Sequence, residues 1–137
     1  MKSPAVVDDL RFEATLVAAQ ESKHGGDCTL HGIYFGEGDP EMGGQHWNFT
    51  RTLGVEDEGV CTVKEIQEVT VYGGIAKFLL TRGSVLCGFD ESTAKETGVR
   101  RLRISFQVDE SRWAQLAEQA RRVFTDQAYF TVSSNAG

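Results

Sequence analysis

Only one segment of this chain repeats its apolar residues with the period of an α-helix over several turns. Asp109 or Ser111, just before this segment, can cap the first turn through a side-chain oxygen. The apolar residues of the segment form one stripe: Trp113, Leu116, Ala117, Ala120, Val123 and Phe124. A helix with a single apolar stripe buries it against another element, so the rest of the chain has to supply that surface.

Most of the remaining apolar residues alternate with polar ones, as in half-buried β-strands. A short helix from about Asp90 to Thr97 interrupts the strands, with Asp90 or Ser92 as N-cap and Gly98 as its stop. The other connections are short turns, which favours antiparallel pairing. The expected strands are residues 10–18, 28–35, 46–53, 60–64, 69–80, 84–89 and 99–108, with a further closing strand at 129–132.

These elements predict an α+β fold. It has a mainly antiparallel sheet of about seven strands packed against one long C-terminal helix, plus one short helix. A chain of 137 residues and 15.1 kDa has the size of one domain. We therefore expect a single domain over residues 1–137, with frayed ends at 1–8 and 133–137.

Cysteine usage and hydropathy indicate where such a chain works. Cys28, Cys61 and Cys87 are odd in number and far apart, which favours buried free thiols in a reducing compartment. No apolar run reaches the ~18 residues that a membrane span needs, and the N-terminus lacks the apolar core of a signal peptide. We expect a cytoplasmic protein with no membrane partner.

The net charge of −6 is unevenly distributed. Residues 1–68 hold 5 Lys/Arg and 13 Asp/Glu, a net of −8, whereas residues 69–137 hold 9 and 7, a net of +2. Lys and Arg drive nucleic-acid binding by displacing counterions, so this balance argues against a nucleic-acid partner. It favours a basic partner through long-range attraction, or else it serves only solubility.

No catalytic motif is recognisable, since a phosphate-binding loop and a Gly-x-Ser-x-Gly elbow are both absent from the sequence. The spacing of His24, Cys28 and His31 could attract zinc, but no fourth ligand is evident, so loop histidines beside a buried cysteine are the favoured interpretation. Glu65 and Glu68 are the one carboxylate pair considered for acid–base work, against a solvated turn. We therefore expect that the protein is not an enzyme and that it binds neither a metal ion nor a cofactor.

The most distinctive short motif is Tyr72-Gly73-Gly74. Its tyrosine either presents a ring to a partner or packs over the glycines to restore strand pairing. The run Glu56-Asp57-Glu58 is either a patch that faces a partner or an ordinary exposed loop. The candidate partner-binding residues are Glu56, Asp57, Glu58, Glu65, Gln67 and Tyr72.

The order of these features resembles the immunity protein 10 family of bacterial polymorphic toxin systems, over residues 12–124. The Tyr-Gly-Gly-Ile piece that follows Glu-x-Gln is the most specific part of the resemblance. The matching segments are Phe12-Glu13-Ala14-Thr15, Trp47-Asn48-Phe49-Thr50-Arg51, Val63-Lys64-Glu65-Ile66-Gln67 and Val71-Tyr72-Gly73-Gly74-Ile75, followed by the hairpin, the short helix, the strand at 102–106 and the amphipathic helix.

The resemblance implies a cytoplasmic, non-enzymatic protein that binds and blocks a cognate toxin domain, which in such systems is often a basic nuclease. Two alternatives stay open. One is a small enzyme or ligand-binding domain with a pocket between sheet and helix, near Glu65, Gln67 and Tyr72. The other is an assembly module in which an exposed edge strand forms a homodimer.

Overall fold

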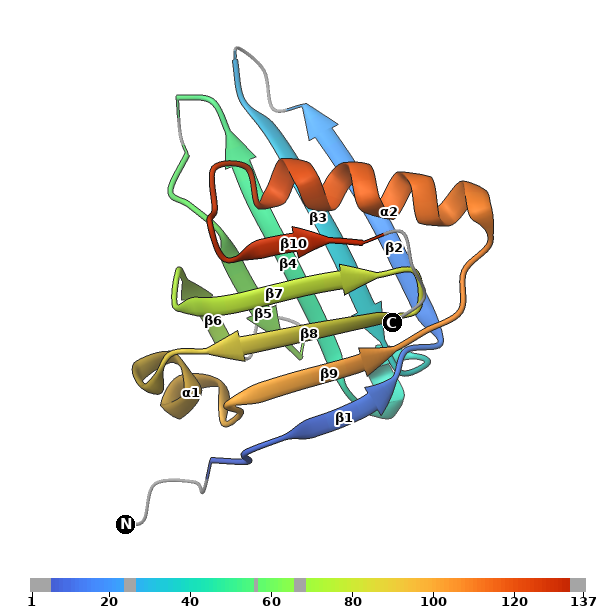
Figure 1. Ribbon diagram of the computed structural model, residues 1–137, viewed down its shortest axis with the longest axis vertical. Coiled ribbons are helices and arrows are strands. Elements are labelled where there is room, and N and C mark those ends of the chain that lie inside the picture. Colours follow the sequence, from blue (N-terminus) through green and yellow to red (C-terminus); the bar gives the residue numbers. More distant parts are fainter. Residues whose placement is uncertain (1–5, 24–26, 56, 66–68, 134–137) are drawn as a thin grey trace.

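The computed structural model describes residues 6–23, 27–55, 57–65 and 69–133, which form two five-stranded sheets (Figure 1). The first sheet has the order β1 (Leu10–Glu13), β9 (Arg101–Ser105), β8 (Ser84–Phe89), β7 (Ile75–Thr81) and β10 (Phe130–Val132). The second sheet has the order β2 (Leu16–Lys23), β3 (Thr29–Gly36), β4 (His46–Leu53), β5 (Cys61–Lys64) and β6 (Val69–Tyr72). A 3-10 turn, η1 (Pro40–Met42), lies in the glycine-rich loop between β3 and β4.

The two sheets form two layers whose strands cross at a steep angle, and α2 (Glu110–Val123) belongs to the layer of the first sheet (Figure 1). In that layer α2 runs beside β10 and packs across β3, β2 and β4 of the second sheet. The helix therefore covers the part of the second sheet's inner face that the first sheet does not reach. The long helix was predicted, but it is not the last element, because β10 follows it.

The α+β class and the mainly antiparallel pairing are confirmed, whereas the prediction of one sheet with about seven strands is wrong. Only the β1–β9 and β7–β10 pairs are parallel among the strand pairs of the described residues. The miscount arises because two apparently continuous strands each contribute to both sheets. Residues 10–18 break at Ala14-Thr15 between β1 and β2, and residues 69–80 break at Gly73-Gly74 between β6 and β7.

Gly74 marks the point where the chain leaves the second sheet for the first. Its φ of +81° is one that residues with a Cβ rarely adopt, and a Cβ there would lie 1.8 Å from Oγ1 of Thr93. Its carbonyl accepts a hydrogen bond of 2.9 Å from the Asp90 amide. The paired glycines thus form a crossover in which the backbone closely approaches the start of α1 (Glu91–Thr97).

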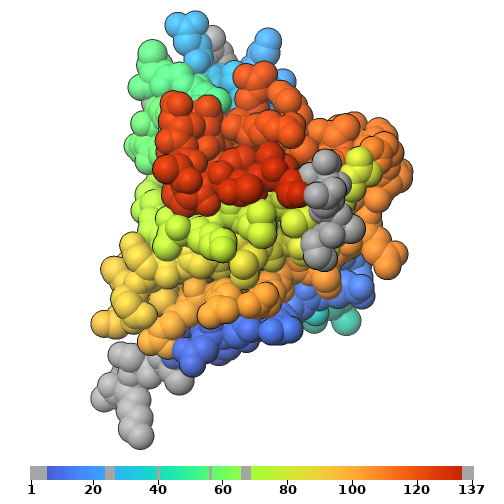
Figure 2. All heavy atoms as spheres, in the orientation of Figure 1, coloured from blue at the N-terminus to red at the C-terminus, as the bar shows by residue number. Residues whose placement is uncertain are grey.

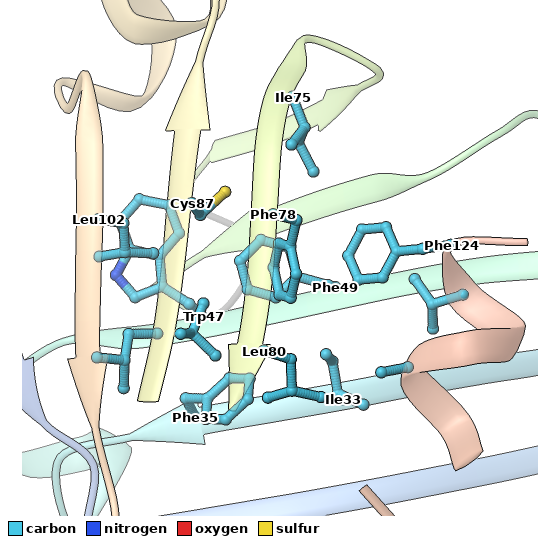
Figure 3. Close-up of a cluster of buried hydrophobic side chains, with 14 of the residues drawn as sticks. Ile33, Phe35, Trp47, Phe49, Ile75, Phe78, Leu80, Cys87, Leu102 and Phe124 are labelled. Carbon is cyan, nitrogen blue, oxygen red and sulfur yellow. The ribbon is translucent and has the colours of Figure 1, made fainter. Parts of the chain in front are cut away.

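Aromatic side chains fill the space between the two layers (Figure 3). Phe78 of β7 packs edge-on against Phe49 of β4, with ring centroids 5.1 Å apart, and lies 4.3 Å from the Phe124 ring at the end of α2. Trp47 stacks on Phe89 at 5.9 Å. The predicted apolar stripe of α2 is buried from Trp113 to Phe124, as expected.

Both helices begin and end as their sequences predict. The Asp109 carboxylate accepts from the Arg112 amide at 2.8 Å, and the Asp90 carboxylate accepts from the Thr93 amide at 2.8 Å. Gly98 ends α1 in the left-handed conformation. Each aspartate satisfies an amide that has no partner inside the first turn, so the earlier of the two candidate caps is the one used in each helix.

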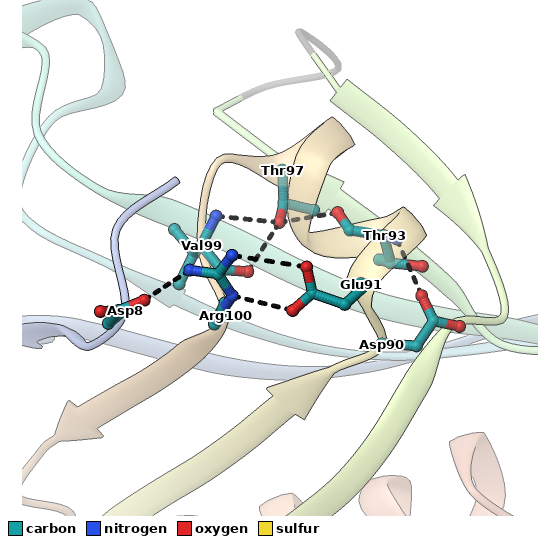
Figure 4. Close-up of polar contacts among 7 residues, drawn as sticks. All are labelled: Asp8, Asp90, Glu91, Thr93, Thr97, Val99 and Arg100. Atoms are coloured by element: carbon teal, nitrogen blue, oxygen red, sulfur yellow. Dashed lines mark hydrogen bonds and ion pairs between the residues drawn. The ribbon is translucent and has the colours of Figure 1, made fainter. Parts of the chain in front are cut away.

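Arg100 ties three separate segments together below α1 (Figure 4). Its guanidinium donates to Glu91 at 2.8 Å and to Asp8 in the segment before β1. Val7 forms an isolated bridge with Val99 beside this cluster. The chain just before β1 is thereby held against the start of β9.

The three cysteines are free and buried, as predicted. In the part of the chain that the structure describes, no helix is both long and apolar enough to cross a membrane.

Candidate functional site

Among the described residues, the outward-facing strand positions of the second sheet carry no Asp, Glu, Lys or Arg. Strand register puts alternate residues of β2 to β6 on this side, while their neighbours point into the core. We call this surface the neutral face; it comprises Leu16, Ala18, Gln20, Ser22, Leu30, Gly32, Tyr34, Gly36, His46, Asn48, Thr50, Thr52, Cys61, Val63, Thr70 and Tyr72. Within the described ranges, neither helix lies on it, since α2 packs on the opposite side.

A hydrogen-bonded aromatic pair stiffens one end of the neutral face. The Tyr34 hydroxyl lies 2.6 Å from Nδ1 of His46, and Nε2 of His46 lies 2.9 Å from the Gly43 carbonyl. A carbonyl only accepts, so in this arrangement Nε2 of His46 is the donor to Gly43, and a neutral His46 ring accepts from Tyr34 through Nδ1. A Cβ at Gly36 would lie 2.3 Å from the Tyr34 oxygen and 2.6 Å from Nδ1 of His46, so a larger residue there would displace this pair. Burial raises the pKa of Tyr34, which keeps the hydroxyl protonated as the donor.

A shallow hollow of about 340 Å³ opens on this face between Gln20, Tyr34 and Val63. Gly32 lies between Gln20 and Thr50 in the register, and the side chains of both lean over it, each within 3.1 Å of the position a Cβ would take. The Oδ1 atom of Asn48, which lines the hollow, has no hydrogen-bond partner in the described part of the protein. The centre of the face is thus slightly concave and lined by neutral polar and aliphatic groups.

Tyr72 lies at the other side of the neutral face and is 57% exposed. It is the cross-strand neighbour of Cys61, and the two line a small hollow together with Glu58. The Cys61 thiol, partial burial and the Glu58 carboxylate raise the pKa of Tyr72. Burial raises the pKa of Cys61 as well, so at neutral pH this corner presents a neutral phenol and a neutral thiol beside one carboxylate.

The six residues predicted to bind a partner are only partly brought together. Glu58 and Tyr72 line the same hollow. Asp57 turns to Arg51, with which it forms two hydrogen bonds of 3.1 and 3.0 Å, and these bonds lower the pKa of Asp57. Glu65 follows the opposite end of β5 and has a φ of +53°. Glu56 and Gln67 lie outside the described residues.

The structure also does not bring together the histidines and the cysteine that the sequence analysis considered as zinc ligands. His24 lies outside the described residues, Cys28 is buried, and Nδ1 of His31 lies 2.7 Å from Oε1 of Gln119 and 3.5 Å from Oε1 of Glu21. Within the described residues, no group of three or more His, Cys, Asp or Glu side chains is arranged to hold a metal ion. Glu68, the second carboxylate of the pair considered for acid–base work, lies outside the described residues.

One hollow lies between sheet and helix, but not where the sequence suggested a pocket. It has a volume of about 420 Å³ and separates β2, at Ala19 and Glu21, from α2, at Ala114 and Glu118. Neither Glu65 nor Tyr72 lines it. Tyr72 belongs to β6, at the opposite edge of the second sheet.

The sequence analysis overlooked most of the neutral face, although its signal is present in the sequence. Tyr34, Asn48 and Thr50 alternate with buried residues of β3 and β4, and no charge occupies the outward positions of these strands. Half-buried strands that face water usually carry charges at such positions, so their absence could have been noted.

Comparison with family models finds no match to this chain. Comparisons with curated proteins and with solved structures find no match either.

Proposed function

We propose that this protein is an immunity protein that binds and neutralises a cognate bacterial toxin domain in the cytoplasm of the cell that makes it. The observation that carries the proposal is the neutral face, whose outward strand positions carry no Asp, Glu, Lys or Arg and which neither helix covers within the described residues. The resemblance to the immunity protein 10 family supports the same function.

A surface of this composition is suited to protein binding. The central parts of protein interfaces are depleted of charge and enriched in tyrosine, because burying an unpaired charge is costly and a tyrosine ring buries a large area with few rotatable bonds. Tyr34 and Tyr72 are the tyrosines of this face. The packed aromatic core beneath it keeps the strands in place, so little conformational entropy would be lost on binding.

Carboxylates at both ends of these strands complement a basic partner. Asp27 and Glu58 flank one end of the sheet, and Glu37, Asp39 and Glu41 flank the other. Such a rim increases the rate of encounter with a basic toxin domain, while the neutral centre forms the contact. A nuclease fits this description, since nucleic-acid enzymes carry basic surfaces.

A small-molecule site between sheet and helix has less support. Aromatic rings occupy the space between the layers, and the hollow beside α2 is lined by two alanines and by Gln and Glu side chains. It is open to solvent, whereas small-molecule sites are usually concave pockets that enclose most of the ligand.

The test uses the toxin domain encoded next to this gene, produced together with this protein in a sensitive host. We expect the protein to restore growth and to bind the purified domain in calorimetry. Thr70→Lys, which puts a cation on the neutral face, is expected to weaken binding by about tenfold or more and to reduce the rescue. Thr131→Lys is the matched control, because Thr131 is also exposed on an edge strand but belongs to the outer face of the first sheet.

Absence of any rescue or binding by the unmodified protein would refute the proposed function. Equal losses in the Thr70 and Thr131 variants would leave a binding function but exclude the neutral face as the contact surface.

A further inference from the structure

The outer face of the first sheet gathers cations although the whole chain has a charge of −6. Register aligns Arg101, Gly88 and Lys77 in one row across β9, β8 and β7. The next row holds Arg11, Arg103 and Leu86 across β1, β9 and β8. We call these six residues the basic groove; they belong to the outer face of the first sheet, the sheet that lies toward the viewer in Figure 1 and in the same view in Figure 2.

The groove is a real depression and not only a charged surface. Two hollows, of about 450 and 250 Å³, adjoin at Leu86. The smaller one lies over Gly88, where a Cβ would meet only the Cβ of Lys77, at 3.8 Å. Lys77 and Arg101 lie on the two strands that flank Gly88. Because neighbouring strands are about 4.8 Å apart, the backbones at Lys77 and Arg101 are separated by about 10 Å, and no side chain rises from Gly88 between them.

Several cations of the groove keep donors free for a ligand. Arg11 and Arg103 share a single carboxylate, that of Asp9, at 3.2 and 3.1 Å. Neither Lys77 nor Arg101 has an ion pair or hydrogen-bond partner among the described residues. Uncompensated cations beside an apolar floor favour a ligand that carries both carboxylates and apolar side chains.

We propose that the basic groove binds an acidic, extended polypeptide segment of a partner protein. Arginine pairs with carboxylates through two parallel hydrogen bonds, and Leu86 offers a contact for an apolar side chain between them. The two adjoining hollows together extend across β1, β9, β8 and β7, so a single extended chain fits them better than a folded domain does.

Nucleic acid fits the same groove less well. None of the six residues of the basic groove is aromatic, so bases would have nothing on which to stack. The four cations are too few for strong counterion release, and two of them share Asp9. This site is separate from the neutral face and does not depend on the toxin-binding proposal.

The test measures the fluorescence anisotropy of a labelled peptide as it binds the protein. The peptide has about ten residues, roughly 33 Å when extended, and it is rich in Glu and contains Leu. We expect binding that weakens as salt is raised, and that is about tenfold weaker for Lys77→Ala/Arg101→Ala. The matched control is Lys23→Ala/Arg121→Ala, which changes the net charge equally at two exposed residues outside the groove. It is expected to stay within about twofold of the unmodified protein.

A second variant separates shape from charge. Gly88→Val fills the hollow between Lys77 and Arg101 without altering the charge, and it is expected to weaken peptide binding by about fivefold while the protein stays folded. Three results would overturn the proposal: equal losses in the two double variants, unchanged binding of a peptide with Gln in place of Glu, or tighter binding of a single-stranded oligonucleotide of equal charge.

Discussion

The outer faces of the two sheets differ far more than their inner faces do. Both inner faces contribute apolar side chains to one core, as Phe49 of the second sheet and Phe78 of the first illustrate. The described outward strand positions of the second sheet carry no Asp, Glu, Lys or Arg, whereas those of the first sheet gather Lys77, Arg101 and Arg103 in a groove. The inner positions of a strand are constrained by packing, so the outward positions are where two similar sheets can acquire different binding properties.

The largest expected effect contrasts an inner with an outer position on neighbouring strands. Phe78→Ala removes a fully buried ring that contacts Phe49 and Phe124, and should lower the free energy of unfolding by about 3–5 kcal/mol. Leu86→Ala, on the outer face of β8, should cost about 1 kcal/mol or less. Urea unfolding measures both. Equal losses would mean that the outer face is packed like the core and is not free to bind.

The next effect concerns the glycines that connect the two sheets. Gly74→Ala adds a Cβ 1.8 Å from Thr93 Oγ1 at a positive φ, so it should destabilise the protein by about 3 kcal/mol. Gly73→Ala shares the positive φ but meets nothing within 4 Å, and should cost only about 1 kcal/mol. Urea midpoints compare the two variants. A loss of stability at Gly73 as large as that at Gly74 would show that the positive φ, and not the contact with α1, is why glycine is needed at this crossover.

Thiol reactivity sharpens the comparison of faces, because Cys61 belongs to the outer face of the second sheet and Cys87 to the inner face of the first. Burial raises the pKa of both thiols, so both should react more slowly than a free cysteine. Cys87 is fully buried and should react only on global unfolding, with a rate that follows stability.

The measurement is labelling with a chromogenic disulfide in a Cys28→Ser background, with peptide mapping of the modified residue. We expect Cys61 to be modified first. Modification of Cys87 before Cys61 would contradict the assignment of inner and outer positions.

The smallest effect is the pH dependence that arises from Asp57. Its folded pKa lies below the unfolded value of about 3.9, because Arg51 donates hydrogen bonds to the carboxylate. The resulting stabilisation is fully present above that unfolded pKa and is lost as pH falls through the lower, folded pKa. Asp57→Asn should therefore lower stability slightly at pH 7 and flatten the fall of the urea midpoint below about pH 4. An unchanged pH profile would show that the ion pair contributes nothing in solution.

Local features of the sequence predicted much of the fold. β4 and β8 have the predicted bounds, Asp90 and Asp109 cap their helices, and the stripe of α2 is buried. These features depend on neighbouring residues alone. The division into two sheets depends on where a strand changes partners, and the alternation of residues 10–18 and of 69–80 continues across both breaks.

The candidate site was harder to predict than the fold. The sequence analysis selected charged residues and residues beside glycines. It therefore included Asp57, whose carboxylate already accepts two hydrogen bonds from Arg51, and it missed Tyr34 and Thr50. Only register puts Tyr34 beside Asn48 and Gly32 beside Thr50. A surface assembled from five strands has no short motif, and its common property, the lack of charge, appears only when the strands are aligned.

The division of the chain between the two sheets also affects how the protein is made. The second sheet uses residues 16–72, whereas the first needs both residues 10–13 and residues 75–132. On the ribosome, all strands of the second sheet are therefore available while β7 to β10 and α2 are still unmade. Its apolar inner side then has no cover, and β1 has to wait for β9 before it can pair. Synthesis of α2 and β10 completes the shielding of that side, so the risk of aggregation is greatest before residues 110–132 have left the ribosome.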